Sequence, residues 1–121
     1  MFHTKLQVEL QDDGSTWKTL QDLVYEDEME GFIGVPEAYL TDFASVPRIP
    51  VVFDLVGDYG HAAATVHDYL YDHGKITRKE IDKVFHRALL DTGVGKFRSY
   101  IMYKGVRLFG FIAFRNARKG K

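Results

Sequence analysis

The chain has 121 residues, of which 45% are hydrophobic and 14% aromatic, and its formal net charge is −1. This length predicts a single domain over residues 1–121 with a core of its own. The near-zero net charge does not favour nucleic acid or an anionic membrane as a partner, and the absence of cysteine excludes disulfides and thiolate chemistry.

The first 46 residues predict a small antiparallel sheet of three or four strands. The expected strands cover residues 2–10, 17–25, 32–36 and 38–40. A turn cluster with Gly14 separates the first two strands, and Pro36 ends the third or places it at an edge. The acidic run 26–30 is typical of a solvated loop. The start of the chain resembles no signal peptide.

Residues 47–121 predict a helical region, with a short helix or turn at 47–57 and then three helices. The first covers 62–72 and ends at His73-Gly74, with the glycine as a left-handed cap. The capping box Thr77 to Glu80 starts the second helix, whose apolar stripe recurs with helical spacing. That stripe consists of Ile81, Val84, Phe85, Ala88 and Leu89.

The third helix is expected from Lys96 to Asn116 and is apolar around most of its circumference. Close packing against another element would explain Gly105 and Gly110, which otherwise cost helix stability. Lys104 and Arg107 interrupt the apolar region, so it falls short of a membrane-spanning helix. The chain is therefore expected to be a soluble α+β protein, with the sheet packed against a three-helix unit.

A candidate site lies on the first helix, where His67 and Tyr71 share one margin of the apolar stripe. Asp82 falls on the border of the stripe of the next helix, so an antiparallel pair of helices would bring these three side chains together. Asp82 would accept hydrogen bonds from the imidazole and the phenol, and the other imidazole nitrogen could act as a general base. The alternative is a surface helix with a histidine at its boundary.

Asp42 lies in the segment 41–48, which has no helix or strand period and predicts a loop tucked against the core. Thr41, Asp42 and Ser45 could simply satisfy backbone donors. In the functional alternative, Asp42 faces the His-Asp helix and joins Asp68 as a ligand of a divalent cation, calcium or zinc. A His base beside such a cation suits ester hydrolysis.

The string His67-Asp68-x-x-Tyr71, followed by Asp82-x-x-Phe85, resembles the catalytic core of phospholipase A2, most closely the short viral capsid versions. The resemblance implies His67 as base, Asp68 as calcium ligand, and Asp82 with Tyr71 as the orienting pair. It covers only the helix pair. The chain departs from that family because the glycine-rich calcium loop expected upstream is missing.

A second resemblance covers nearly the whole chain. It rests on Val35-Pro36, Leu40 to Arg48, His67 to Tyr71, Arg78 with Asp82-x-x-Phe85, and Met102-Tyr103 with Val106-Arg107. These residues are similar to the phage-associated family called domain of unknown function 1353. The resemblance implies a phage or prophage origin, and a place in the virion or in the host cytoplasm during infection.

Two functions follow as hypotheses. The favoured one is a structural or assembly component of a phage tail or virion, which binds other virion proteins or itself through the C-terminal helix. The alternative is a small metal-assisted hydrolase with His67 as base, used in entry or lysis. Nucleic-acid binding is disfavoured, because Lys104, Arg107, Arg115 and Arg118 are typical of a solvated face.

Overall fold

The computed structural model describes residues 1–43 and 59–119, and of Tyr59 the backbone only. The helix or turn expected at 47–57 and the cap expected at Ser45 lie outside the described residues.

Within residues 1–43, five short strands form two antiparallel sheets. The strands β1 (Val8–Leu10), β2 (Trp17–Thr19) and β5 (Leu40–Thr41) make a sheet in the order β1-β2-β5. The strands β3 (Leu23–Asp27) and β4 (Gly31–Val35) make a separate hairpin, in which Leu23 pairs with Val35. Together with three C-terminal helices this confirms the α+β class.

The prediction of one strand over 17–25 was wrong, because the chain changes sheets after Thr19. The Thr19 hydroxyl donates to the Pro36 carbonyl at 2.7 Å and accepts from the Tyr39 amide at 2.9 Å. These bonds hold Thr19 to the segment that leads into β5, while β3 turns Leu23 and Tyr25 into the core. The strand expected over 2–10 is likewise reduced to β1 and an isolated bridge between Phe2 and Tyr25.

The reading of residues 26–30 as a solvated loop was also wrong for Asp27, which closes β3 and is 2% exposed. Its carboxylate accepts two hydrogen bonds from Arg87, at 2.8 and 3.0 Å, and one each from the Met29 and Glu30 amides. Burial alone would raise the pKa of Asp27, but these donors together hold the pKa below its usual value. The ion pair ties the β3–β4 hairpin to the second helix of the C-terminal unit.

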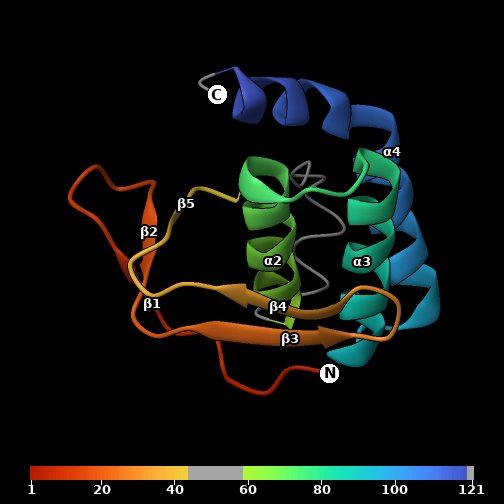
Figure 1. The fold of residues 1–121 in the computed structure, drawn as a ribbon, viewed down its shortest axis with the longest axis horizontal. Coiled ribbons are helices and arrows are strands. Elements are labelled where there is room, and N and C mark those ends of the chain that lie inside the picture. The colour runs from red at the N-terminus through yellow and green to blue at the C-terminus, as the bar shows by residue number, and fades with distance from the viewer. Residues whose placement is uncertain (44–58, 120–121) are drawn as a thin grey trace.

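The helices are α2 (Tyr59–His73), α3 (Arg78–Asp91) and α4 (Lys96–Arg118). Figure 1 shows α2 and α3 side by side, with the β3–β4 hairpin across one end of the pair. The first part of α4 runs along α3, and its last part turns across the opposite ends of α2 and α3. All three predicted helices are present, and the first and third each extend beyond the predicted range.

The predicted start of α3 is confirmed, whereas the predicted conformation of the glycine after α2 is wrong. The Thr77 hydroxyl caps α3 by accepting the Glu80 amide at 3.2 Å, as the capping box predicted. Gly74 follows α2 as expected but does not adopt the left-handed conformation. A glycine is needed there for space, because a Cβ atom would lie 2.5 Å from the Leu70 carbonyl oxygen.

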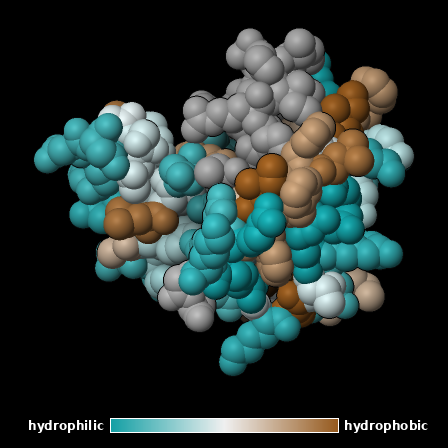
Figure 2. All heavy atoms as spheres, turned by 90° about the horizontal axis from the view of Figure 1, so that it is seen from above, coloured by the Kyte–Doolittle hydropathy of each residue, from teal (hydrophilic) through white to brown (hydrophobic). Residues whose placement is uncertain are grey.

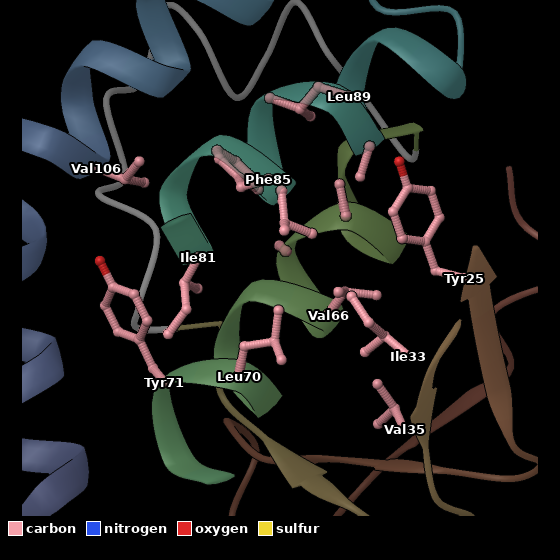
Figure 3. Packing of buried hydrophobic residues seen from close by; sticks show 14 of the residues in the cluster. Tyr25, Ile33, Val35, Val66, Leu70, Tyr71, Ile81, Phe85, Leu89 and Val106 are labelled. Carbon is pink, nitrogen blue, oxygen red and sulfur yellow. The ribbon is translucent and has the colours of Figure 1, made fainter. Parts of the chain in front are cut away.

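The core lies where the β3–β4 hairpin meets α2 and α3 (Figure 3). Ile33 and Val35 point from β4 toward Val66 on α2, and Phe85 lies between the helices. All five members of the α3 stripe are fully buried, as predicted. This packing fixes the rotation of α3 and so turns Asp82, one position after Ile81, into the protein interior.

Candidate functional site

Four side chains donate to the carboxylate of Asp82. Its Oδ1 atom lies 2.7 Å from His67 Nε2 and 2.7 Å from the Tyr71 hydroxyl. Its Oδ2 atom lies 2.8 Å from Arg107 Nη1 and 3.3 Å from Arg78 Nη1. The predicted meeting of His67, Tyr71 and Asp82 is therefore observed, and the network joins α2, α3 and α4.

The two arginines were not predicted as members of the site. Arg78 lies one turn before Asp82 on α3, and its guanidinium also donates to the carbonyls of Val106, at 3.0 Å, and Arg107, at 3.2 Å. Arg107 had been read as part of a solvated basic strip. A helical i, i+4 Arg–Asp spacing could have suggested Arg78. Nothing in the sequence fixes the rotation of α4 that brings Arg107 inward.

The imidazole of His67 is fully buried. Its ring centroid lies 4.1 Å from that of Tyr71 and 4.9 Å from that of Phe85. Burial lowers the pKa of His67, and this outweighs the opposite effect of the Asp82 carboxylate, whose charge Arg78 and Arg107 already balance. The ring is therefore neutral, and the bond to Asp82 assigns its proton to Nε2.

Tyr71 lies against Gly110, where α4 approaches α2 closely. A Cβ atom at Gly110 would lie 2.5 Å from the Tyr71 hydroxyl oxygen and 3.2 Å from Arg78 Nη1. The predicted close packing at Gly110 is thus confirmed. Without a side chain at this position, α4 leaves room for the Tyr71 hydroxyl and the Arg78 guanidinium that donate to Asp82. Burial raises the pKa of Tyr71, and the Asp82 carboxylate raises it further, so the phenol remains a hydrogen-bond donor at neutral pH.

A second set of carboxylates lines a groove between β5, α2 and the last part of α4. The groove has a volume of about 580 Å³, and we call it the acidic groove after Asp42, Asp68 and Asp72. Its apolar wall includes Leu40, Phe109 and Ile112.

Asp68 and Asp72 are fixed at the acidic groove by hydroxyl groups from β5 and the segment before it. Thr41 donates to Asp68 at 2.7 Å, and Tyr39 donates to Asp72 at 2.5 Å and to Asp68 at 3.3 Å. Burial raises the pKa of Tyr39, as do the neighbouring carboxylates, so its hydroxyl stays protonated.

The structure thus divides the predicted site residues between two places. Asp42 and Asp68 share the acidic groove, and Tyr71 contributes to its lining. His67 and Asp82 are buried and do not line it. Among residues 1–43 and 59–119, no group of three or more histidines and acids is arranged to hold a metal ion, so the divalent cation at Asp68 and Asp42 stays a prediction.

Arg118, another arginine of the expected basic strip, also turns inward. Arg118 donates to the carbonyls of Tyr71, at 2.6 Å, Leu70, at 3.2 Å, and Gly74, at 2.8 Å. These bonds lie at the C-terminal end of α2, where carbonyl groups lack further helical residues to bond with. They fasten the last turn of α4 to α2.

The opposite side of α4 is exposed and largely apolar. Side chains at helical spacing form a stripe that we call the outer face of α4. Its members are Phe97, Tyr100, Lys104, Leu108, Phe111 and Arg115, all exposed. Phe97 is 76% exposed and Leu108 64%. Figure 2 looks onto the side over which the last part of α4 passes, and it shows hydrophobic side chains beside hydrophilic ones there.

No helix in the described part of the chain is both long and apolar enough to span a bilayer. Large apolar side chains exposed together on one helix commonly mark a contact with another molecule.

Comparison with known proteins gives one match. A protein-family model described as "Protein of unknown function (DUF1353)" matches residues 17–106. No curated protein and no solved structure matches the chain. The matched region contains the whole Asp82 network except its last hydrogen-bond donor, Arg107, which follows the final matched residue.

Proposed function

The chain belongs to the DUF1353 family, and we propose that it acts as a structural or assembly component of a phage tail or virion. In this proposal the Asp82 network holds α2, α3 and α4 together, and the outer face of α4 contacts another protein chain. One observation carries the proposal: the His67–Asp82 pair is fully buried, while large apolar side chains on α4 are exposed.

The burial of His67 favours a structural role over a catalytic one. A general base must come within hydrogen-bond reach of the proton that it removes, directly or through one water. The His67 side chain is 0% exposed, and so is that of Asp82. Buried polar groups that are fully hydrogen-bonded rigidify a protein interior and specify its packing. The described residues have no buried side-chain nitrogen or oxygen without a partner, which fits such a network.

The exposed side chains of α4 support the second half of the proposal. Contiguous exposed apolar surface on a water-soluble protein commonly marks an interface, and large aromatic side chains contribute strongly to binding energy at such surfaces. Phe97, Tyr100 and Phe111 supply three aromatic rings on one helix face. The phage setting is what the resemblance to phage-associated members of the family implies.

The hydrolase remains as the second candidate, because the order of contacts from Asp82 to His67 matches that of a carboxylate orienting a base. In a neutral imidazole whose Nε2–H donates to Asp82, Nδ1 is the nitrogen that a base would use to accept a proton. For this reading the site must open to substrate. The test is hydrolysis of phospholipid vesicles with added Ca²⁺ or Zn²⁺, and activity lost in His67→Ala would establish it.

One substitution separates the two functions. His67→Gln retains a side-chain N–H that can donate to Asp82, but it has no imidazole to act as a base. We expect a phage or prophage that carries His67→Gln to produce infectious particles containing the chain. Infectivity lost from particles that still contain the folded variant would refute the structural role and favour the hydrolase.

The contact surface is tested in the same particles. Leu108→Glu places a carboxylate in the middle of the outer face of α4 and should remove the chain from purified particles. Lys96→Glu, an exposed position on α4 outside that face, serves as the control and should be retained. Equal retention of both variants would contradict docking through this face.

A further inference from the structure

The basic residues of this chain are concentrated in its last helix and tail. Residues 96–121 contain eight of the 16 lysines and arginines and none of the 17 aspartates and glutamates. Residues 1–95 therefore carry eight basic against 17 acidic side chains, a net charge of −9 with neutral histidines. The overall charge of −1 hides this separation into a negative body and a positive helix.

The outer face of α4 combines that positive charge with apolar surface. Lys104 and Arg115 are exposed among Tyr100, Leu108 and Phe111. Arg107 and Arg118, the arginines of α4 that turn inward, donate to Asp82 and to the end of α2. Lys104 and Arg115 are thus the cations that this face presents to a partner, and the best partner surface is both acidic and apolar.

The acidic groove has this complementary chemistry. Asp72 lines it together with Phe109 and Ile112, and no lysine or arginine is among the described residues that line it. Hydroxyl donors hold the carboxylates of Asp68 and Asp72 in place, so these two side chains need no rearrangement before binding.

We infer that the outer face of α4 of one copy docks into the acidic groove of a second copy. Because the two surfaces are different parts of the same chain, the contact is head-to-tail. Each added copy leaves one free groove and one free α4 face, so the assembly grows into a filament or closes into a ring. This inference rests on the proposed function and names the partner as the chain itself.

Sedimentation velocity of the purified full-length chain tests the inference. The wild type should sediment faster as its concentration rises, and added salt should reverse this because it screens the charges. Arg115→Glu reverses a charge on the α4 face, and Asp72→Lys reverses a charge in the groove. Each variant alone should self-associate about tenfold or more weakly than the wild type, since like charges then oppose across the contact.

Mixing the two variants gives the decisive result. The intact groove of Arg115→Glu can receive the intact α4 face of Asp72→Lys, and the two reversed charges also attract each other, so an equimolar mixture should form dimers and longer assemblies that neither variant forms alone. A contact between two identical faces could not produce this rescue. Lys96→Glu and Glu30→Lys make the same charge changes at exposed positions outside both surfaces and should assemble like the wild type.

Three outcomes would overturn the inference: a monomeric wild type at every concentration, an Asp72→Lys variant with normal assembly, or a mixture that forms no dimer. Circular dichroism and thermal melting of each variant establish that the fold is kept, and Asp72→Asn serves as a milder groove variant if Asp72→Lys unfolds. A monomeric chain that is still retained in particles, with Leu108→Glu lost from them, would remove the head-to-tail contact and leave the proposed function standing.

Discussion

Replacing Asp82 with asparagine should destabilise the protein severely. The change keeps the shape of the side chain but removes the negative charge that faces Arg78 and Arg107, and it leaves a single acceptor oxygen where four donors now converge. Removing one partner of a buried ion pair costs about 3–5 kcal/mol, because the remaining charge loses its compensation. Asp82 is 0% exposed, whereas the Arg78 and Arg107 side chains are 21% and 28% exposed, so water can compensate for only part of the lost charge.

Urea denaturation followed by circular dichroism provides the measurement. With a slope of about 1–3 kcal/mol per molar urea for a small protein, a loss of this size should lower the midpoint by roughly 2 M. The free energy of unfolding of a small domain is only about 5–15 kcal/mol. The yield of folded protein is therefore a second measure of the loss. Asp12→Asn, at an exposed turn position, should change stability by less than about 0.5 kcal/mol.

A double substitution tests whether Asp82 and Arg107 stabilise the protein through each other. Arg107→Met in the Asp82→Asn background removes a charge that has lost its partner, so it should cost much less than Arg107→Met in the wild type. A loss below about 1 kcal/mol for Asp82→Asn, or additive effects of the two changes, would refute the idea that this carboxylate joins the three helices.

Three further predictions concern single positions. The free energy of unfolding of the wild type should fall as the pH drops below about 6.5, by up to about 1.4 kcal/mol per pH unit. The reason is that His67 binds a proton in the unfolded chain but not in the folded protein, where burial lowers its pKa. In urea titrations His67→Gln should show a smaller loss, and parallel curves for the two proteins would contradict this. Gly110→Ala should cost about 1–3 kcal/mol by overpacking, and less in a Tyr71→Phe background, where the clashing hydroxyl is absent; equal thermal shifts in both backgrounds would exclude that contact. Asp27→Asn should cost about 2 kcal/mol at pH 7, and the difference should vanish as acid protonates the wild-type carboxyl through and below its lowered pKa; a difference independent of pH would show that the Arg87 ion pair is not the cause.

The helices and the centre of the Asp82 network could be predicted because they depend on local spacing. The stripe from Ile81 to Leu89 sets which side of α3 is buried, and a short connection to the preceding helix makes the two antiparallel. His67 and Tyr71, one turn apart, then share the side that faces Asp82. These relations need only the helical period and the length of a loop, and both are visible in the chain.

The strands were predicted less well, because short strands are defined by their pairing partners. Residues 17–25 have one continuous β-forming composition, yet Thr19 is held by the segment around Tyr39, while Tyr25 enters the core beside the helices. β propensity reflects how a residue fits its surroundings more than an intrinsic backbone preference. The break between β2 and β3 was therefore not visible in composition.

The sequence by itself determined the α+β class, three helices and the meeting of an imidazole, a phenol and a carboxylate. Only the tertiary structure decided that Arg107 completes this network, that Asp68 lies apart from it in the groove, and that His67 and Asp82 are fully buried. The physical reason is that local periodicity fixes which face of a helix is apolar, whereas the rotation and crossing of α4 depend on side chains brought together from distant parts of the chain, such as Gly110 against Tyr71.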